Sequence, residues 1–112
     1  MLKIESYVPL VTALMHMFQA AHRDRYAQES KQTINPHPIH EKLKEMEAVC
    51  GIKRAYYILA AAIHYYVSER DHKGYRIVFD DLFDPKYDWV LNQCIDASRA
   101  KFIEVYRDSL NN

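Results

Sequence analysis

Histidines are the first residues in this sequence whose type invites a chemical role, because neutral imidazole is a common ligand of transition metals. The chain of 112 residues contains six of them. His37 and His40 lie three positions apart with Glu41 adjacent, a spacing that one helical turn can bring together. Pro36 and Pro38 interrupt the same segment, however, and a solvated turn explains it equally well. We therefore predict no metal site and no cofactor.

A second group of polar residues follows one face of the segment from Ile52 to Glu69. Projected at about 100° per residue, this face carries Lys53, Arg54, Tyr57, Ala61, His64 and Ser68. An imidazole near a phenol in a cleft can perform acid–base chemistry, but a hydrogen-bonded boundary histidine is the interpretation we favour for His64. The chain contains no phosphate-binding loop, HExxH pair or nucleophile elbow, and its two glycines offer little material for one. We expect no enzymatic activity.

Lys53 and Arg54 occupy the first turn of this segment, where the helix macrodipole disfavours cations by a few tenths of a kcal/mol each. Two interpretations explain them. Ion pairs with Glu45 or Glu47 across the preceding turn are the one we favour, although such pairs contribute little at a surface. The other is recognition of an acidic partner. Our candidate binding residues on this segment are Lys53, Arg54, Tyr57 and His64.

Acidic and aromatic residues alternate between positions 80 and 89. Asp84 has a structural explanation, because an Asp before Pro85 is a typical helix start. Asp80 and Asp81 have no evident local role, so we predict that they form an acidic docking edge or an ion site. The spacing lacks the full set of oxygen ligands that a calcium loop requires.

Helices must position all of these groups. Apolar residues recur at three- and four-residue steps in the first segment, which predicts a helix over about residues 6–28. Ser6 is its predicted N-cap, with Pro9 in the first turn. After the proline-rich break, a second helix is expected over about residues 37–50, with Gly51 as its left-handed C-cap residue.

The third helix, about residues 52–69, is apolar or aromatic on most of its circumference, so we place it at the centre of the fold. The last helix begins at Asp84 and runs to about residue 109. Residues 75–79 have strand composition, and residues 2–4 are their candidate partner. The prediction is an all-α or mostly α single domain over residues 1–112, a compact bundle of about four helices that allows one minor two-stranded element.

Composition sets further bounds. Two glycines and four prolines are too few for the turns of a sandwich or barrel. Fifteen Lys and Arg balance fifteen Asp and Glu, which disfavours strong binding to the phosphate backbone of nucleic acids. Cys50 and Cys94 have no metal-ligand spacing and occupy positions typical of buried helix residues. With no signal peptide and no apolar run of about 20 residues, we expect a cytoplasmic protein without a membrane segment.

Nine tyrosines exceed what a core needs, because each buried phenol requires a hydrogen-bond partner. The tyrosines that we predict at an interface are Tyr26, Tyr57, Tyr65, Tyr66 and Tyr75. Near-zero net charge favours self-association, and we predict a homodimer through the last helix. Phe102, Tyr106 and Leu110 continue its apolar line. The alternative is that the first helix covers these residues within one subunit.

The run from Gly51 to Ile63, followed by Asp71, Gly74, Arg76 and Trp89, resembles a small uncharacterised domain carried on bacterial mobile elements. In that domain a Gly-x-x-Arg-Val-x-Tyr-Val-Leu-Ala core precedes an Asp-Gly-Arg turn and a tryptophan. Here Ala55 takes the place of the valine, and two residues separate Asp71 from Gly74. The resemblance implies a phage or conjugative-element origin and no catalytic residue.

These observations together predict a small non-enzymatic interaction or regulatory protein that binds a host protein. The alternative is a nucleic-acid-binding accessory protein that uses the basic and aromatic face of the third helix.

Overall fold

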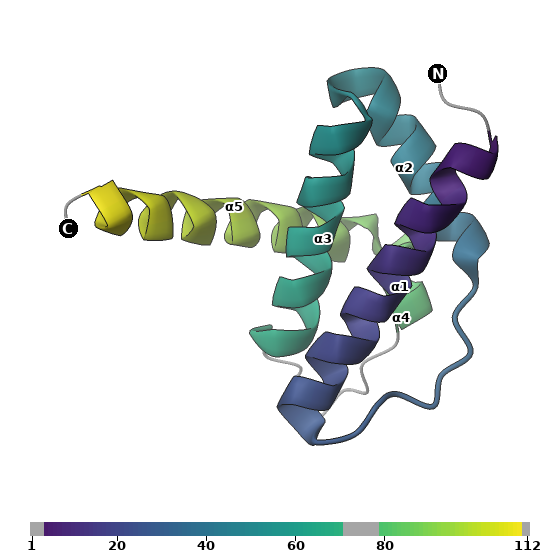
Figure 1. Cartoon of the computed structure of the whole chain (residues 1–112), viewed down its shortest axis with the longest axis horizontal. Helices are drawn as coiled ribbons and strands as arrows, with labels where there is room; N and C mark the ends of the chain where they lie inside the picture. Colours follow the sequence, from purple (N-terminus) through teal and green to yellow (C-terminus); the bar gives the residue numbers. More distant parts are fainter. Residues whose placement is uncertain (1–3, 71–78, 111–112) are drawn as a thin grey trace.

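The chain folds into four long helices, α1 (Ile4–Tyr26), α2 (Pro36–Cys50), α3 (Ile52–Ser68) and α5 (Asp88–Leu110). The short helix α4 (Phe79–Leu82) and a 3₁₀ turn (Pro85–Tyr87) lie between the last two. The computed structural model describes residues 4–70 and 79–110, and the side chains of residues 6–70, 79, 80 and 82–100. No strand occurs in the described residues. The predicted all-α bundle of four helices is confirmed (Figure 1).

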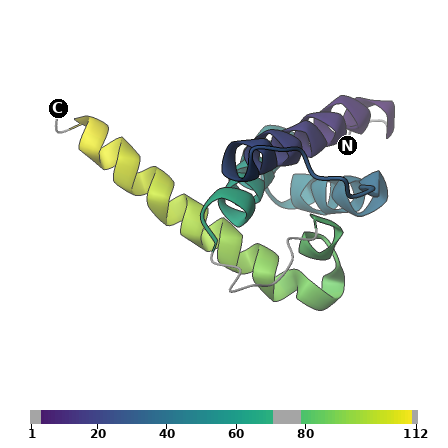
Figure 2. The same cartoon turned by 90° about the horizontal axis from the view of Figure 1, so that it is seen from below.

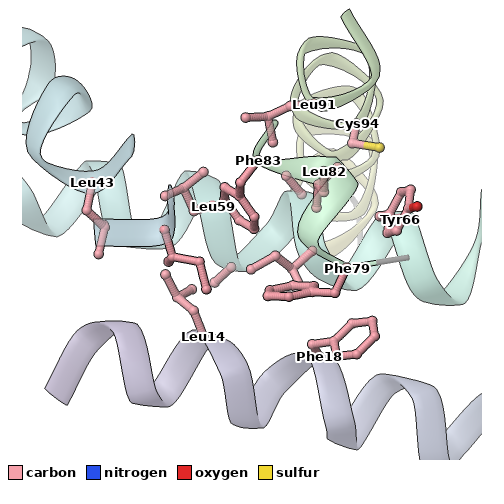
Figure 3. Close-up of a cluster of buried hydrophobic side chains, with 14 of the residues drawn as sticks. Leu14, Phe18, Leu43, Leu59, Tyr66, Phe79, Leu82, Phe83, Leu91 and Cys94 are labelled. Carbon is pink, nitrogen blue, oxygen red and sulfur yellow. The ribbon is translucent and has the colours of Figure 1, made fainter. Parts of the chain in front are cut away.

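Helix α3 lies at the centre of the bundle. It packs against α1 and α2 on one side, and α5 crosses it on the other (Figure 2). Leu59 and Ile63 of α3 have no exposed surface, and Tyr66 is 5% exposed. Figure 3 shows that side chains from α1, α4 and α5 converge on these residues. The predicted central position of this apolar helix is therefore confirmed, because several neighbouring helices bury it.

Helix α1 starts earlier and ends sooner than the sequence predicts. It begins at Ile4, so Ser6 lies inside the helix and the predicted N-cap is wrong. Tyr7, in the first turn of this helix, is 1% exposed and packs in the core. The helix ends at Tyr26 because Ala27 adopts a left-handed φ of 61°, and the Ala27 amide bonds the carbonyl of Arg23 at 2.8 Å.

Arg25 joins the ends of α1 and α3. Its guanidinium donates hydrogen bonds to the carbonyls of Val67 and Arg70, at 2.5 and 3.1 Å. These carbonyls lie at the end of α3, where a helix leaves acceptors without an internal donor. The two helices therefore finish side by side, with the same direction along the bundle.

The predicted limits of α2 are nearly right. The helix starts at Pro36, and the Asn35 side chain caps it by accepting a hydrogen bond from the His37 amide at 3.1 Å. It ends at Gly51, whose φ of 84° is left-handed, as predicted for a C-cap residue. Helix α3 starts at the next residue, so one glycine separates two long helices.

The predicted strand is wrong at its described ends. Residues 75–78 and 2–3 lie outside the described residues, but Phe79 begins α4 and Ile4 begins α1, so both are helical. Phe79 is fully buried, with its ring 4.4 Å from that of Phe18 and 5.3 Å from that of Phe83. Phe79 and Phe83 stand four residues apart, a spacing that brings side chains together only in a helical turn. Tertiary packing thus overrides the local strand propensity.

Helix α5 begins at Asp88, four residues later than the predicted start at Asp84. The Asp84 carboxylate accepts a hydrogen bond from the Lys86 amide at 2.9 Å, and Pro85 opens the 3₁₀ turn that leads into the helix. The first half of α5 packs across α3, where Leu91 and Cys94 are buried. The second half runs on beyond the other helices (Figures 1 and 2).

Candidate interaction surface

The structure exposes one narrow face of α3 along its whole length. Its exposed residues are Lys53, Arg54, Tyr57, Ala61 and His64, which we call the α3 face. Ser68 continues it but is half-buried. The remaining positions of the helix are buried or half-buried, so the projection at 100° per residue correctly separated the two sides.

Lys53 and Arg54 form no ion pair with any described residue. The ion pairs that we favoured from the sequence are therefore wrong. Glu45 instead lies 3.6 Å from the ammonium group of Lys42, one turn earlier on α2. Lys42 in turn donates to the carboxylate of Asp88 at 3.2 Å, which ties α2 to the start of α5. Glu45 thus pairs with a lysine of its own helix and not with a cation of α3.

Tyr57 is the tyrosine of the α3 face, with 61% of its surface accessible. Its ring meets that of Tyr56 edge to face, at a centroid distance of 5.6 Å. Tyr56 is half-buried and packs against the core. The exposed ring of Tyr57 is therefore supported from one side by a fixed neighbour.

His64 is exposed two turns further along α3. In the described part of the chain, no hydrogen bond joins it to Tyr57 or Ser68. The side chain of His64 is exposed, so the partly buried boundary position that we predicted for it is wrong.

Asp80, in α4, does not join the α3 face. The Asp80 carboxylate accepts a hydrogen bond from the backbone amide of Asn35 at 3.1 Å, beside the start of α2. Asp80 therefore has a structural role, to accept a hydrogen bond from the backbone next to α2. The sequence did not reveal this role because the two residues are 45 positions apart. The side chain of Asp81 lies outside the described residues, so an acidic docking edge at this residue stays a prediction.

The histidines near α2 line a shallow hollow between α1 and α2. Its volume is about 440 Å³, and its walls are formed by Val8, Val11, Thr12, Met15, Pro36, His37 and His40. The His40 ring meets the Tyr7 ring edge to face at 4.8 Å. Val8 is 58% exposed beside this hollow, although the apolar pattern of the first segment placed it on the buried face of α1. No three metal-ligating side chains converge among the described residues.

The two cysteines are free thiols with different surroundings. Cys94 is fully buried in α5, and burial raises the pKa of its thiol to about 11, although the positive charge of Arg70 opposes this shift. Cys50 is only half-buried at the end of α2. The thiol of Cys94 is therefore protonated and poorly nucleophilic at neutral pH.

Four of the five tyrosines that we expected at an interface lie in the described residues. Tyr57 and Tyr26 are exposed, at 61% and 42%, and Tyr65 is half-buried. Tyr66 is buried against the core, so its placement at a surface was wrong. Tyr75 lies in the segment that the structure leaves undescribed.

The distal part of α5, residues 99–110, leaves the bundle. Ser98 is still half-buried, whereas Arg99 and Ala100 are exposed. In Figure 2, α1 lies on the opposite side of α3 from α5 and does not run along this distal part. Coverage by the first helix within one subunit, our alternative for Phe102, Tyr106 and Leu110, therefore does not fit the course of the backbone. The side chains of these three residues lie beyond those described.

Comparison with protein-family models, with curated proteins and with solved structures gives no significant match to this chain. Among the described helices, none combines the length and the apolar character needed to cross a bilayer.

Proposed function

We propose that this chain is a small, cytoplasmic, non-enzymatic interaction protein that binds a host protein and also self-associates through α5. The observation that carries the proposal is the distal part of α5, which extends past its own bundle (Figure 1). Helices in proteins are stabilised mainly by packing of an apolar face. A helix end that the described part of its own chain leaves uncovered is therefore a natural contact for a second chain.

The sequence of the distal part supports this use. Apolar residues at positions 102 and 105 follow Leu91, Ile95 and Ser98 in the same steps of three and four. The pattern that packs α5 onto α3 thus continues for about two more turns. A standard interface needs about 800 Å² from each partner, and zero net charge leaves no long-range repulsion to prevent it.

A mobile-element origin is part of the proposal. Its support is the resemblance of the Gly51–Ile63 run to a domain of bacterial mobile elements. Such an origin favours binding to a host protein, because small proteins of phages and conjugative elements often act in this way. The residues of that run build α3, the helix that both carries the core and presents the α3 face.

Light scattering at micromolar concentration tests the self-association. We expect about twice the chain mass of 13.3 kDa for the wild type and 13.3 kDa for Phe102→Asp combined with Tyr106→Asp. Asn92→Asp combined with Gln93→Asp adds the same charge on the exposed side of α5 within the bundle and should remain dimeric. A wild-type mass of 13.3 kDa would refute the dimer, and a dimer that survives the first variant would refute this face.

The alternative function is nucleic-acid binding through the α3 face, and the observation in its favour is that Lys53 and Arg54 are unpaired among the described residues. Fluorescence anisotropy with a labelled DNA duplex separates the two. Two phosphate contacts predict roughly a tenfold loss of DNA affinity between about 50 and 200 mM salt. A protein partner that is held in part by an aromatic residue should respond less to salt.

A further inference from the structure

The α3 face carries positive charge that the described chain does not neutralise. Lys53 and Arg54 are both exposed and have no anionic neighbour within ion-pair distance among the described residues. Their position in the first turn of α3 is also unfavourable for the helix itself. Nothing in the described fold therefore explains two adjacent cations at this place. Complementary negative charge from another molecule does explain them.

An aromatic anchor stands one turn beyond the two cations. Tyr57 is 61% exposed, yet its ring is held edge to face by Tyr56, which packs against the core. A side chain that is positioned before binding loses less conformational entropy when a partner arrives. Tyrosine and arginine are also the residue types enriched at the energetic centres of protein interfaces.

The rest of the α3 face allows a partner segment to lie along it. Ala61 and His64 follow Tyr57 at four and seven residues, which places all three on one side of the helix. Ala61 has a small side chain, so the surface is low between Tyr57 and His64. The described part of the chain leaves all five residues of the α3 face exposed.

The charge on this surface suits a protein segment better than a nucleic acid. A duplex-binding surface commonly makes six to ten phosphate contacts. The α3 face has only two permanent cations, in a chain whose net charge is zero. Its remaining residues are Tyr57, Ala61 and His64, which contribute apolar and hydrogen-bonding surface.

The geometry points to the α3 face as the binding site for an acidic segment of another protein. Carboxylates of that segment pair with Lys53 and Arg54, and an apolar side chain packs against the ring of Tyr57. This inference rests on the proposed function and gives the chemistry of the host partner. It is independent of the dimer contact through α5.

Selection from a display library of random 16-residue peptides tests the inference with a defined probe. The wild-type chain should enrich peptides that combine several Asp or Glu with an aromatic or aliphatic residue. Lys53→Glu combined with Arg54→Glu should bind the selected peptides at least about tenfold more weakly, because like charges then face each other. Tyr57→Ala should also weaken them by about tenfold or more.

A matched variant separates the site from the overall charge. Lys31→Glu combined with Lys44→Glu makes the same charge change at two exposed lysines outside the α3 face. It should bind the selected peptides as the wild type does. All substituted residues are exposed, so the helical circular dichroism spectrum should be unchanged for every variant. The Lys53 and Arg54 variant should melt at the same or a slightly higher temperature, because acidic residues in the first turn of a helix suit its macrodipole.

Each outcome decides a different point. Acidic peptides that lose affinity with the Lys53 and Arg54 variant, and keep it with the control, support the inference. Enriched peptides without acidic bias, or with equal affinity for both variants, overturn the inference and leave the proposed function standing. Failure to enrich any peptide family also overturns the inference, and the proposed function is tested separately by light scattering. Tight binding of a DNA duplex that the Lys53 and Arg54 variant abolishes overturns the inference in favour of the nucleic-acid alternative.

Discussion

Replacement of Leu59 by alanine probes the central position of α3 directly. Leu59 has no exposed surface and lies where side chains of α1, α4 and α5 converge on α3 (Figure 3). The change removes about three carbon atoms, and at about 0.8 kcal/mol for each buried methylene the loss of transfer free energy is about 2.4 kcal/mol.

The cavity left behind adds to this cost. Because α3 is packed by α1, α2 and α5, the surrounding helices can collapse only partly into the space. We therefore expect Leu59→Ala to lower the free energy of unfolding by about 3 to 5 kcal/mol. Ile63→Val, a milder change at another fully buried position of α3, should cost about 0.5 to 1.5 kcal/mol.

Urea unfolding followed by circular dichroism at the helical band measures these losses. Tyr57→Ala is the matched control on the same helix, because its side chain is 61% exposed, and it should change stability by no more than about 0.5 kcal/mol. A loss below about 1 kcal/mol for Leu59→Ala would mean that α3 is peripheral, and the account of the fold would be wrong.

Two further predictions concern other parts of the fold. Cys94 should resist a thiol reagent in the folded protein at pH 8, while the half-buried Cys50 reacts, so one thiol is titrated before unfolding and two after it. Since the pKa of Cys94 is raised from 9.0 to about 11, its contribution to stability is complete below pH 9 and is lost as the pH rises towards 11. Relative to Cys94→Ala, the wild type should therefore lose stability over this range, and parallel pH profiles would contradict it. Asp80→Ala should cost about 1 kcal/mol in urea unfolding, because the amide of Asn35 loses its acceptor, and an unchanged midpoint would show that this hydrogen bond is dispensable.

The parts of the fold that local pattern determines were predictable from the sequence. The all-round apolar character of residues 52–69 indicated a central helix, and the 100° projection identified its exposed face. Gly51 and Asp84 marked helix boundaries because their local roles, a left-handed φ and a side-chain cap, need no distant partner.

The features that depend on distant contacts were not predictable. Phe79 is helical because its ring packs on Phe18, more than sixty residues earlier in the chain. Asp80 bonds an amide 45 residues away, and Lys42 reaches Asp88 across 46 residues. A single sequence shows that such groups exist but not which of them meet. For the same reason it could not show that Lys53 and Arg54 stay unpaired among the described residues.

Affinity enrichment from host lysate tests the central claim, that this chain acts by binding another protein through the α3 face. The wild-type chain and the variant Lys53→Glu, Arg54→Glu, Tyr57→Ala would be immobilised at equal density, and the retained proteins compared by quantitative mass spectrometry after nuclease treatment. We predict a small set of host proteins with acidic segments that the wild type retains and the variant loses. Identical retained proteins for both chains, or no protein retained above background, would contradict the account.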